Sequence, residues 1–277
     1  MKEVEIEVIK EFFTEILPYI VSSYQKKGEI TVTTKRDATD FLTEVDLFVQ
    51  NSFVKKVKKV FPEDIIIGEE AGFSQYEEDY NGRAWVIDPI DGTANFVRSY
   101  FPAFTVAIAF VNKGEVMCSG VLIPMTGDVF IAEKGKGAWQ NGNKIGVSSK
   151  KKLNEACVHL DFGRKSSRET RLPLFLNPII SVGQIRCIGS AIFSLVQVAM
   201  GIADAYVHTS LQPWDFLAGK LLLEEAKGRV SQVDGSPVHL FSKNNGIIAT
   251  NGHIHEELLA IINKPLKIFE IDSPNLG

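Results

Sequence analysis

The sequence predicts an α+β protein in which layers of helices are stacked against mixed or antiparallel sheets. Three observations support this prediction. Helical and strand-like segments alternate along the chain without the regular strand–helix–strand rhythm of a parallel sheet. Between residues 103 and 133, strand-like segments follow one another directly. The chain has 277 residues and is 45% apolar, which is enough for a sizeable core between such layers.

The spacing of apolar residues predicts the elements of the first half in order. Residues 3–24 and about 43–60 place their apolar side chains on one helical face, and Pro62 ends the second helix. Residues 30–34 alternate like a strand before the polar loop 35–40. Apolar runs and an Asn-Gly pair predict further strands at 65–70, 85–87, 103–111, 115–123 and 128–133, and a hairpin within 135–145.

A second half is predicted to begin near residue 150. Residues 1–150 and 151–277 would then be two halves of one compact unit with a soft boundary. Ser190 is a suitable N-cap, and the apolar residues after it predict a helix that Gly201 closes. The other predicted elements are a strand at 203–208, a helix at 214–228, a strand at 246–250 and a helix at 254–263.

The composition excludes several classes of protein. The formal net charge of −4 argues against a dedicated nucleic-acid surface. No apolar run reaches the roughly 18 residues that a membrane helix needs. The three cysteines are widely spaced and form no C-x-x-C pair, so we expect reduced thiols in a cytoplasmic protein. Neither a membrane nor a nucleic acid is therefore an expected partner.

Residues 85–97, WVIDPIDGTANFV, carry the most informative pattern. A buried strand runs into Asp88 and Asp91, and Pro89 and Gly92 are expected to break it there. Ligands collect at the carboxyl ends of strands in layered α/β folds. Free backbone N–H groups can hold a phosphate where the next helix begins. Two hard oxygen ligands beside a phosphate seat indicate magnesium-dependent phosphate chemistry.

A plain turn and several unrelated enzyme classes fit this stretch less well. An Asp-Gly turn alone does not account for two carboxylates on one short loop. Haloacid-dehalogenase-type phosphatases carry D-x-D-x-T after an apolar strand, whereas this chain has D-x-x-D-G-T, with the second aspartate one residue later. The chain has no G-x-x-x-x-G-K-[ST] loop, which excludes a P-loop nucleotide enzyme. No Cys-based or Ser-His hydrolase motif is present, and Ser190 is not in a G-x-S-x-G elbow.

Further carboxylates stand at the ends of other predicted elements. Glu69 follows a strand, Asp215 opens a helix, and Asp40 and Asp46 flank the start of the second helix. Taken singly, each could be a charged turn residue, an acid favoured by a helix dipole, or a surface residue. Gathered in one place these carboxylates would repel one another, so either cations neutralise them or they lie apart.

Taken together, these residues resemble the inositol monophosphatase family over nearly the whole chain. The matching motifs are GEE at 68–70, WVIDPIDGTANFVR at 85–98, GKGAWQNG at 135–142, IGSA at 188–191 and PWDFLAG at 213–219. The DPIDGT motif is highly specific, and the PWD motif follows it in the right order. The resemblance implies a five-layer αβαβα sandwich, a homodimer, and a lithium-sensitive enzyme with two or three Mg²⁺ ions per site.

The resemblance also implies roles for individual residues. The magnesium ligands would be Glu69, Asp88, the carbonyl of Ile90, Asp91 and Asp215. The catalytic residues would be Asp46, Glu69 and Thr93, with Asp46 and Thr93 orienting the attacking water. One ion near Glu69, Ile90 and Thr93 would activate this water, and a second would stabilise the leaving oxygen. The substrate-binding residues would be Asp91, Gly92 and Thr93 around the phosphate, and Gly189, Ser190, Ala191 and His208 around the leaving group.

The resemblance implies a phosphomonoesterase whose first candidate substrate is myo-inositol monophosphate. His208, however, stands where many inositol phosphatases carry an acid, and a neutral imidazole accepts one hydroxyl hydrogen bond where a carboxylate accepts two. If His208 lines the pocket, fructose 1,6-bisphosphate, NADP(H) or 3′-phosphoadenosine 5′-phosphate becomes a better candidate. If it only ends a strand near the surface, the preference is unchanged. A regulatory binding protein is the non-enzymatic alternative, although the complete carboxylate set favours catalysis.

Overall fold

The computed structural model describes residues 2–265, except residues 27, 71, 74, 100, 164, 243 and 244. The predicted elements of the first half are present, with ends shifted by a few residues. They are α1 (Lys2–Gln25), β1 (Val32–Thr34), β2 (Phe41–Thr43), α2 (Glu44–Val60), β3 (Ile65–Gly68), β4 (Ala84–Asp91), α3 (Thr93–Arg98), β5 (Thr105–Asn112), β6 (Glu115–Ile123), β7 (Asp128–Glu133), β8 (Gly137–Gln140) and β9 (Asn143–Lys144).

The second half contains elements that the sequence patterns do not single out. Between residue 151 and Ser190 the chain forms two strands and two helices that we did not predict. In chain order the elements are a 3₁₀ turn (Leu153–Glu155), β10 (Cys157–Asp161), α4 (Lys165–Arg171), α5 (Pro173–Ser181), β11 (Gln184–Arg186), α6 (Ala191–Ala199), β12 (Ala205–Leu211), α7 (Pro213–Glu225), β13 (Arg229–Gln232), β14 (Asn245–Thr250) and α8 (His255–Ile262).

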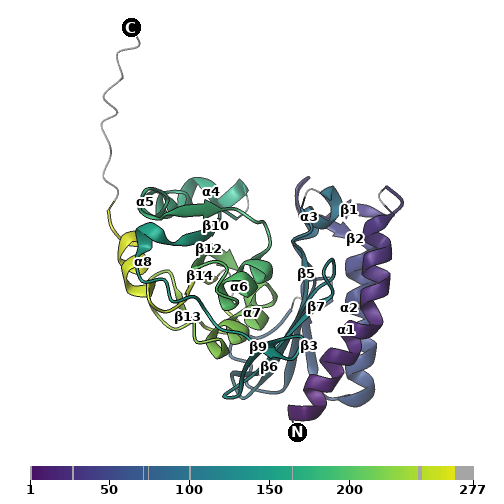
Figure 1. The fold of residues 1–277 in the computed structure, drawn as a ribbon. Coiled ribbons are helices and arrows are strands. Elements are labelled where there is room, and N and C mark those ends of the chain that lie inside the picture. Colours follow the sequence, from purple (N-terminus) through teal and green to yellow (C-terminus); the bar gives the residue numbers. More distant parts are fainter. Residues whose placement is uncertain are drawn as a thin grey trace.

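The elements stack as five alternating layers of helices and sheets, as Figure 1 shows. Helices α1 and α2 cover one face of a seven-stranded sheet that runs in the order β3-β4-β5-β6-β7-β8-β9. Helices α6 and α7 lie between this sheet and a five-stranded sheet of order β11-β10-β12-β14-β13. Helices α5 and α8 pack on the far side of the second sheet. This is the αβαβα sandwich that the resemblance implies.

The two large sheets are mixed, as the irregular alternation of elements predicts, whereas β1 and β2 form a separate antiparallel pair. In the first sheet β3 and β4 are parallel, and every later neighbour pairs antiparallel. In the second sheet β10 lies parallel to β11 and β12, whereas β14 is antiparallel to β12 and β13. Among the helices of the described residues, none is long and apolar enough to cross a membrane.

Three apolar cores hold the five layers together. The core under α1 and α2 includes the fully buried Phe12, Phe53 and Trp85, whose rings pack edge to face, with Phe53 5.1 Å from Phe12 and 5.8 Å from Trp85 between centroids. The central core joins both sheets to the middle helices through residues such as Leu195 and Leu222. Burying these side chains is the main favourable term in folding, at roughly 1.5–3 kcal/mol for each large one. The packing of these cores therefore determines how the two large sheets and the helices between them are placed relative to one another.

The end of β4 differs from the sequence-based expectation. We expected Pro89 to break the strand, but β4 continues through Asp91 and all eight of its residues are buried. The pairing with β5 shifts register between Asp88 and Asp91 instead. Proline has no N–H to donate to a neighbouring strand, so within a sheet it is accommodated at such irregularities. The irregularity falls at Pro89 and Ile90, Asp91 pairs again with Thr105, and the chain then enters α3 through Gly92.

Candidate active site

Two adjoining cavities open where the two halves of the chain meet. The smaller, of about 200 Å³, is lined by acidic side chains and by the backbone that follows β4: Thr39, Asp40, Phe41, Glu69, Asp88, Ile90, Asp91, Gly92, Thr93, Ala94, Gly189 and Asp215. The larger, of about 380 Å³, shares Asp91, Gly189 and Asp215 with it. The fold therefore brings all five predicted metal-binding residues to one place.

Asp91 joins the two halves of the protein. Its side chain is 7% exposed and accepts hydrogen bonds from the backbone N–H groups of Ala191 (3.0 Å) and Ile192 (2.9 Å), at the start of α6. The hydroxyl of Ser190, the N-cap of α6, also donates to it from 99 residues away. A carboxylate at a helix N-terminus is stabilised by these N–H groups and by the helix dipole. Burial nevertheless raises the pKa of Asp91, although these hydrogen bonds oppose the rise.

Asp88 is also buried, but it lacks the set of hydrogen bonds that stabilises the Asp91 carboxylate. It is 2% exposed, and its Oδ1 atom has no hydrogen-bond partner among the described residues. Burial holds the pKa of Asp88 well above its usual range, and the negative charges of Glu69, Asp91 and Asp215 raise it further. A buried, unpaired carboxylate surrounded by like charges is costly unless a cation accompanies it.

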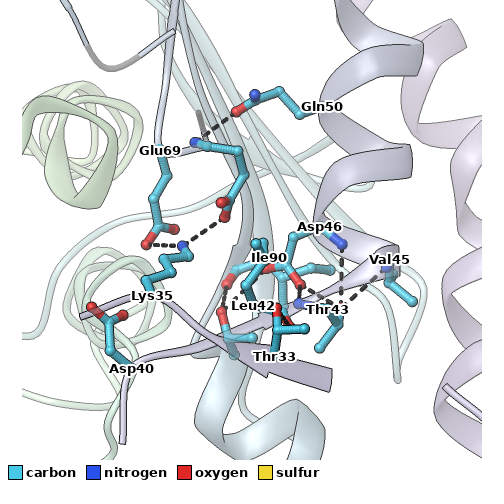
Figure 2. Close-up of polar contacts among 12 residues, drawn as sticks. Thr33, Lys35, Asp40, Leu42, Thr43, Val45, Asp46, Gln50, Glu69 and Ile90 are labelled. Carbon is cyan, nitrogen blue, oxygen red and sulfur yellow. Dashed lines mark hydrogen bonds and ion pairs between the residues drawn. The ribbon is translucent and has the colours of Figure 1, made fainter. Parts of the chain in front are cut away.

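Lys35 partly neutralises the opposite wall of the cavity. Its Nζ lies 2.8 Å from Glu69 and 2.7 Å from Glu70, and Figure 2 shows it extended towards Glu69. Burial lowers the pKa of Lys35, but the charges of the two glutamates outweigh this and hold the pKa above its usual value. Burial and the charge of Glu69 raise the pKa of Glu70 to about 7 even beside Lys35. In the Lys35–Glu70 pair, the effect of burial on the pKa of Glu70 is larger than the opposing effect of the lysine charge. Lys35 is therefore charged, while Glu70 titrates near neutral pH.

Asp46 and Thr93 meet beside the end of β4, as the resemblance implies. Thr93 Oγ1 lies 3.3 Å from Asp46 Oδ1 and 2.9 Å from the Ile90 carbonyl oxygen. The other carboxylate oxygen of Asp46 accepts from the backbone N–H of Thr43 (2.9 Å) and from its hydroxyl, which closes a capping box at the start of α2 (Figure 2). Burial raises the pKa of Asp46 to about 6, although the hydrogen bonds from Thr43 oppose the rise. The capping box with Thr43 thus fixes the Asp46 carboxylate in the position where it contacts Thr93.

Asp215 has two roles in the structure. It stands in the first turn of α7, and its Oδ2 accepts from the backbone N–H of Gln212 (2.7 Å), as an ordinary helix-terminal acid does. The same side chain lines both cavities. Asp215 therefore stabilises the start of a helix and faces the candidate metal site at the same time.

Gly92 makes the turn that places the chain beside these acids. Its φ is +89°, in the left-handed region that favours glycine, and it is the N-cap of α3. A Cβ at this position would lie 3.0 Å from the carbonyl oxygen of Ala103 and 3.0 Å from the Cβ of Ser190. Only a residue without a side chain fits between the two halves here.

The predicted substrate residues divide into two groups. Gly92 and Thr93 line the smaller cavity and Ala191 and His208 line the larger one, while Asp91 and Gly189 line both. His208 lies on β12, is 8% exposed, and its Nδ1 accepts from the backbone N–H of Ser210 at 3.0 Å. Ser190 is 2% exposed and its hydroxyl serves Asp91 and the start of α6. His208 therefore lines the pocket. Ser190, which we expected around the leaving group, lines neither cavity and instead holds Asp91 in place.

The donor set fits magnesium. The residues around the smaller cavity offer carboxylate and carbonyl oxygens, which are the ligands that Mg²⁺ prefers, and Asp88 Oδ1 still lacks a partner among the described residues. As the described side chains stand, no three acidic, histidine or cysteine residues are grouped closely enough to hold a metal ion. Lys35 and backbone N–H groups at helix N-termini instead occupy oxygens of Glu69, Asp91 and Asp215. The chemistry of the donors, together with one orphaned buried oxygen, therefore supports the fit.

Sequence reasoning missed several residues at this site. Lys35 was assigned only to a polar loop, and no local pattern indicates that it faces Glu69. Arg36, Asp161, Arg171 and Tyr206 line the larger cavity, yet they come from segments separated by up to 170 residues. Asp161 and Arg171 lie in the stretch before Ser190, whose elements we did not predict. Tyr206 lies in the strand predicted at 203–208, but nothing in its local pattern indicates that it faces a cavity.

Comparison with known proteins finds relatives over nearly the whole chain. The model of the inositol monophosphatase family matches residues 1–266. The chain is 38% identical to a Nus factor SuhB of Pseudomonas aeruginosa, over 89% of this chain and 91% of that protein. It is 35% identical to a fructose-1,6-bisphosphatase/inositol-1-monophosphatase of Thermotoga maritima, over 84% and 86%. A crystal structure of an IMPase/NADP phosphatase with Mg²⁺ and phosphate superposes with a TM-score of 0.83 at 26% identity, over 95% and 96% of the two chains.

Proposed function

Because the chain belongs to the inositol monophosphatase family, we propose that it is a magnesium-dependent phosphomonoesterase acting on a small phosphorylated metabolite. The observation that carries this proposal is the cavity lined by Glu69, Asp88, Ile90, Asp91 and Asp215. Two or three Mg²⁺ ions bound there would supply a water of lowered pKa and neutralise charge on the phosphate. Sensitivity to lithium is part of the proposal.

The residues of the chain have distinct tasks in the proposed reaction. Asp46 and Thr93, 3.3 Å apart, hold and orient the attacking water. Asp46 is a suitable proton acceptor near neutral pH because burial raises its pKa to about 6. Gly92 and Thr93 present backbone N–H groups towards the phosphate at the end of β4. Asp88, Asp91 and Asp215 would hold cations on the side of the leaving oxygen.

The larger cavity receives the alcohol part of the substrate in this proposal. It adjoins the acidic cavity through Asp91, Gly189 and Asp215. Because His208 lines it, an acidic partner for inositol hydroxyls is replaced by an imidazole. Candidate substrates are therefore myo-inositol monophosphate, fructose 1,6-bisphosphate, NADP(H) and 3′-phosphoadenosine 5′-phosphate, and the double name of the Thermotoga maritima relative supports including the first two.

A phosphate-release panel tests the proposal. The purified chain is incubated with inositol 1-phosphate, fructose 1,6-bisphosphate, NADP and 3′-phosphoadenosine 5′-phosphate, each with Mg²⁺, with EDTA, and with Mg²⁺ plus LiCl. We expect release from at least one compound with Mg²⁺, none with EDTA, and less with lithium. A folded protein that releases phosphate from none of them would contradict the enzymatic proposal.

A regulatory binding role is the second candidate. It is favoured by the 38% identity to a protein named as a Nus factor, which covers 89% of this chain. In this case the chain would bind a component of the transcription machinery, and its acidic cavity would have no role in turnover. Inactivity across the phosphate panel would favour this role. The spacing of the three cysteines supports a cytoplasmic location for either function.

We also propose that the chain forms a homodimer through an apolar stripe around α5. Leu172, Leu176 and Ile180 recur every fourth residue there and are 43%, 42% and 63% exposed. Replacing Leu176 and Ile180 together by glutamate is expected to give a monomer in size-exclusion chromatography with light scattering. The matched control, Ile202→Glu, changes a residue that is 60% exposed elsewhere and should leave the dimer intact. A wild-type monomer at micromolar concentration would overturn this proposal.

A further inference from the structure

The larger cavity contains two hydrogen-bond donors that nothing in the described structure satisfies. Arg171, the last residue of α4, has its Nη1 buried without a hydrogen-bond partner among the described residues. Tyr206, on β12, is 1% exposed, and its hydroxyl is likewise buried without a partner among them. Both side chains line the cavity that adjoins the acidic site. Buried polar groups normally have a partner, so two unpaired donors in one cavity indicate a ligand with acceptors.

Arg171 forms no ion pair with any of the described residues, although Asp161 lines the same cavity. Burial raises the pKa of Asp161, while the charge of Arg168 and backbone hydrogen bonds, such as that from Gly189, oppose the rise. Arg36 is paired with Asp40 at 2.7 Å. Asp91 and Asp215 face the proposed cations instead. His208 does not neutralise the positive charge of Arg171, because an imidazole is either neutral or positively charged.

We infer that Arg171 and Tyr206 form a subsite for a second anionic group on the alcohol part of the substrate. This inference rests on the proposed phosphatase function and specifies its substrate class: a phosphate monoester whose leaving group carries a further phosphate or carboxylate. The scissile phosphate occupies the acidic cavity, and the second anion occupies the larger cavity beside it. Arg171 supplies a charged donor, and Tyr206 supplies a neutral one.

The physical chemistry of the two donors favours an anion over a sugar hydroxyl. A guanidinium presents its N–H groups in a planar fork that matches phosphate and carboxylate oxygens. Hydrogen bonds to a charged partner are roughly twice as strong as neutral ones. Tyr206 is held in place by the strand pairing of β12 with β10, where it stands opposite His159. A rigid strand residue and a charged helix residue thus approach the same space from two elements.

Matched substrates test the inference on the wild-type enzyme. Fructose 1,6-bisphosphate is compared with fructose 1-phosphate, and 3-phosphoglycerate with glycerol 3-phosphate, each with saturating Mg²⁺. The first pair tests a second phosphate, and the second pair tests a carboxylate. We expect kcat/KM to be at least about tenfold higher for the doubly anionic member of at least one pair, mainly through a lower KM.

Three variants assign the preference to the two residues. Arg171→Gln is expected to raise KM for the preferred dianionic substrate about tenfold or more, and to raise KM for its singly charged counterpart by a clearly smaller factor, so that the preference falls. Arg171→Lys should retain part of the preference, because it keeps the charge but not the planar fork. Tyr206→Phe should reduce the preference by a smaller factor. Arg186→Gln, which removes the same charge from the exposed strand β11, is the control and should change nothing.

The outcomes separate this inference from the proposed function. Turnover with equal kcat/KM for both members of both pairs would overturn the subsite and leave the phosphatase proposal intact. A preference that survives in Arg171→Gln would also overturn it. No Mg²⁺-dependent turnover of any substrate would instead overturn the phosphatase proposal, on which the subsite depends. The wild-type comparison decides the first point even if a variant fails to fold, and circular dichroism identifies such a variant.

Discussion

Replacing Asp91 by asparagine is expected to remove nearly all Mg²⁺-dependent phosphate release while the protein stays folded. Asp91 belongs to both cavities and is one of the proposed cation ligands. Asparagine keeps the size and one acceptor oxygen but loses the negative charge that binds a divalent ion. Charge stabilisation by a metal contributes several kcal/mol to such reactions, so kcat/KM should fall by about a thousandfold or more.

The same substitution should also have a modest structural effect. The Asp91 carboxylate accepts from Ala191, Ile192 and Ser190 at the start of α6. An asparagine NH₂ group turned towards these donors weakens the capping, and we expect a loss of about 1–2 kcal/mol in the free energy of unfolding. Thermal unfolding followed by circular dichroism measures this loss.

Ser190→Ala is the control that separates capping from chemistry. It removes the hydroxyl that donates to Asp91 but keeps the carboxylate charge. We expect a similar loss of stability with less than about a tenfold loss of activity. Wild-type levels of magnesium-dependent turnover in Asp91→Asn would show that Asp91 is not a cation ligand. A Ser190→Ala variant as inactive as Asp91→Asn would show that helix capping, and not the charge, is what activity requires.

Replacing Asp88 by asparagine is expected to stabilise the metal-free protein and to abolish its stabilisation by Mg²⁺. Burial holds the pKa of Asp88 well above its usual range, and the charges of Glu69, Asp91 and Asp215 add to this. An acid whose pKa is higher in the folded than in the unfolded state destabilises the fold once the pH exceeds its unfolded value. At neutral pH the neutral amide should therefore add about 1–3 kcal/mol to the free energy of unfolding in EDTA.

The measurement is the melting temperature in EDTA and in Mg²⁺. For the wild type we expect Mg²⁺ to raise the melting temperature, because an ion that binds only the folded state stabilises it. Asp88→Asn should melt higher than wild type in EDTA, by several degrees, and should respond little to Mg²⁺. Its activity should be lost despite the gain in stability. A lower melting temperature in EDTA, or an unchanged response to Mg²⁺, would contradict the assignment.

Asp128→Asn provides a contrast of opposite sign. Although its burial opposes the effect, hydrogen bonds from Thr126, Gln140 and Asn141 hold the pKa of Asp128 below its usual value. Its charged form is therefore favoured by folding, and the asparagine variant should lose stability in EDTA and Mg²⁺ alike. Because Asp128 lies outside both cavities, activity should be unchanged.

Local sequence patterns predicted much of the fold. The apolar face of α2, the Asn-Gly turn between β8 and β9, and the Ser190 cap of α6 are each encoded within a few residues. The Asn141-Gly142 turn has φ of +49° and +82°, values that this residue pair adopts readily. The prediction for β4 failed at Pro89 because neighbouring strands keep a buried strand in the sheet through an irregular register. The elements between Cys157 and Arg186 were missed because β10 and β11 are short and because α5 contains two prolines, which argue against a helix.

The sequence alone indicated most of the elements and the acidic motifs, because periodicity, caps and turns depend on neighbouring residues. It therefore indicated the reaction class and most of the residues around the acidic cavity. Long-range packing decided which side chains share the site: Ser190 with Asp91, Lys35 with Glu69, and Arg171 with Tyr206. These pairs come from separate elements, and their proximity depends on how the two sheets pack against the middle helices. No local pattern encodes that packing, so the residues that face the leaving group became visible only in three dimensions.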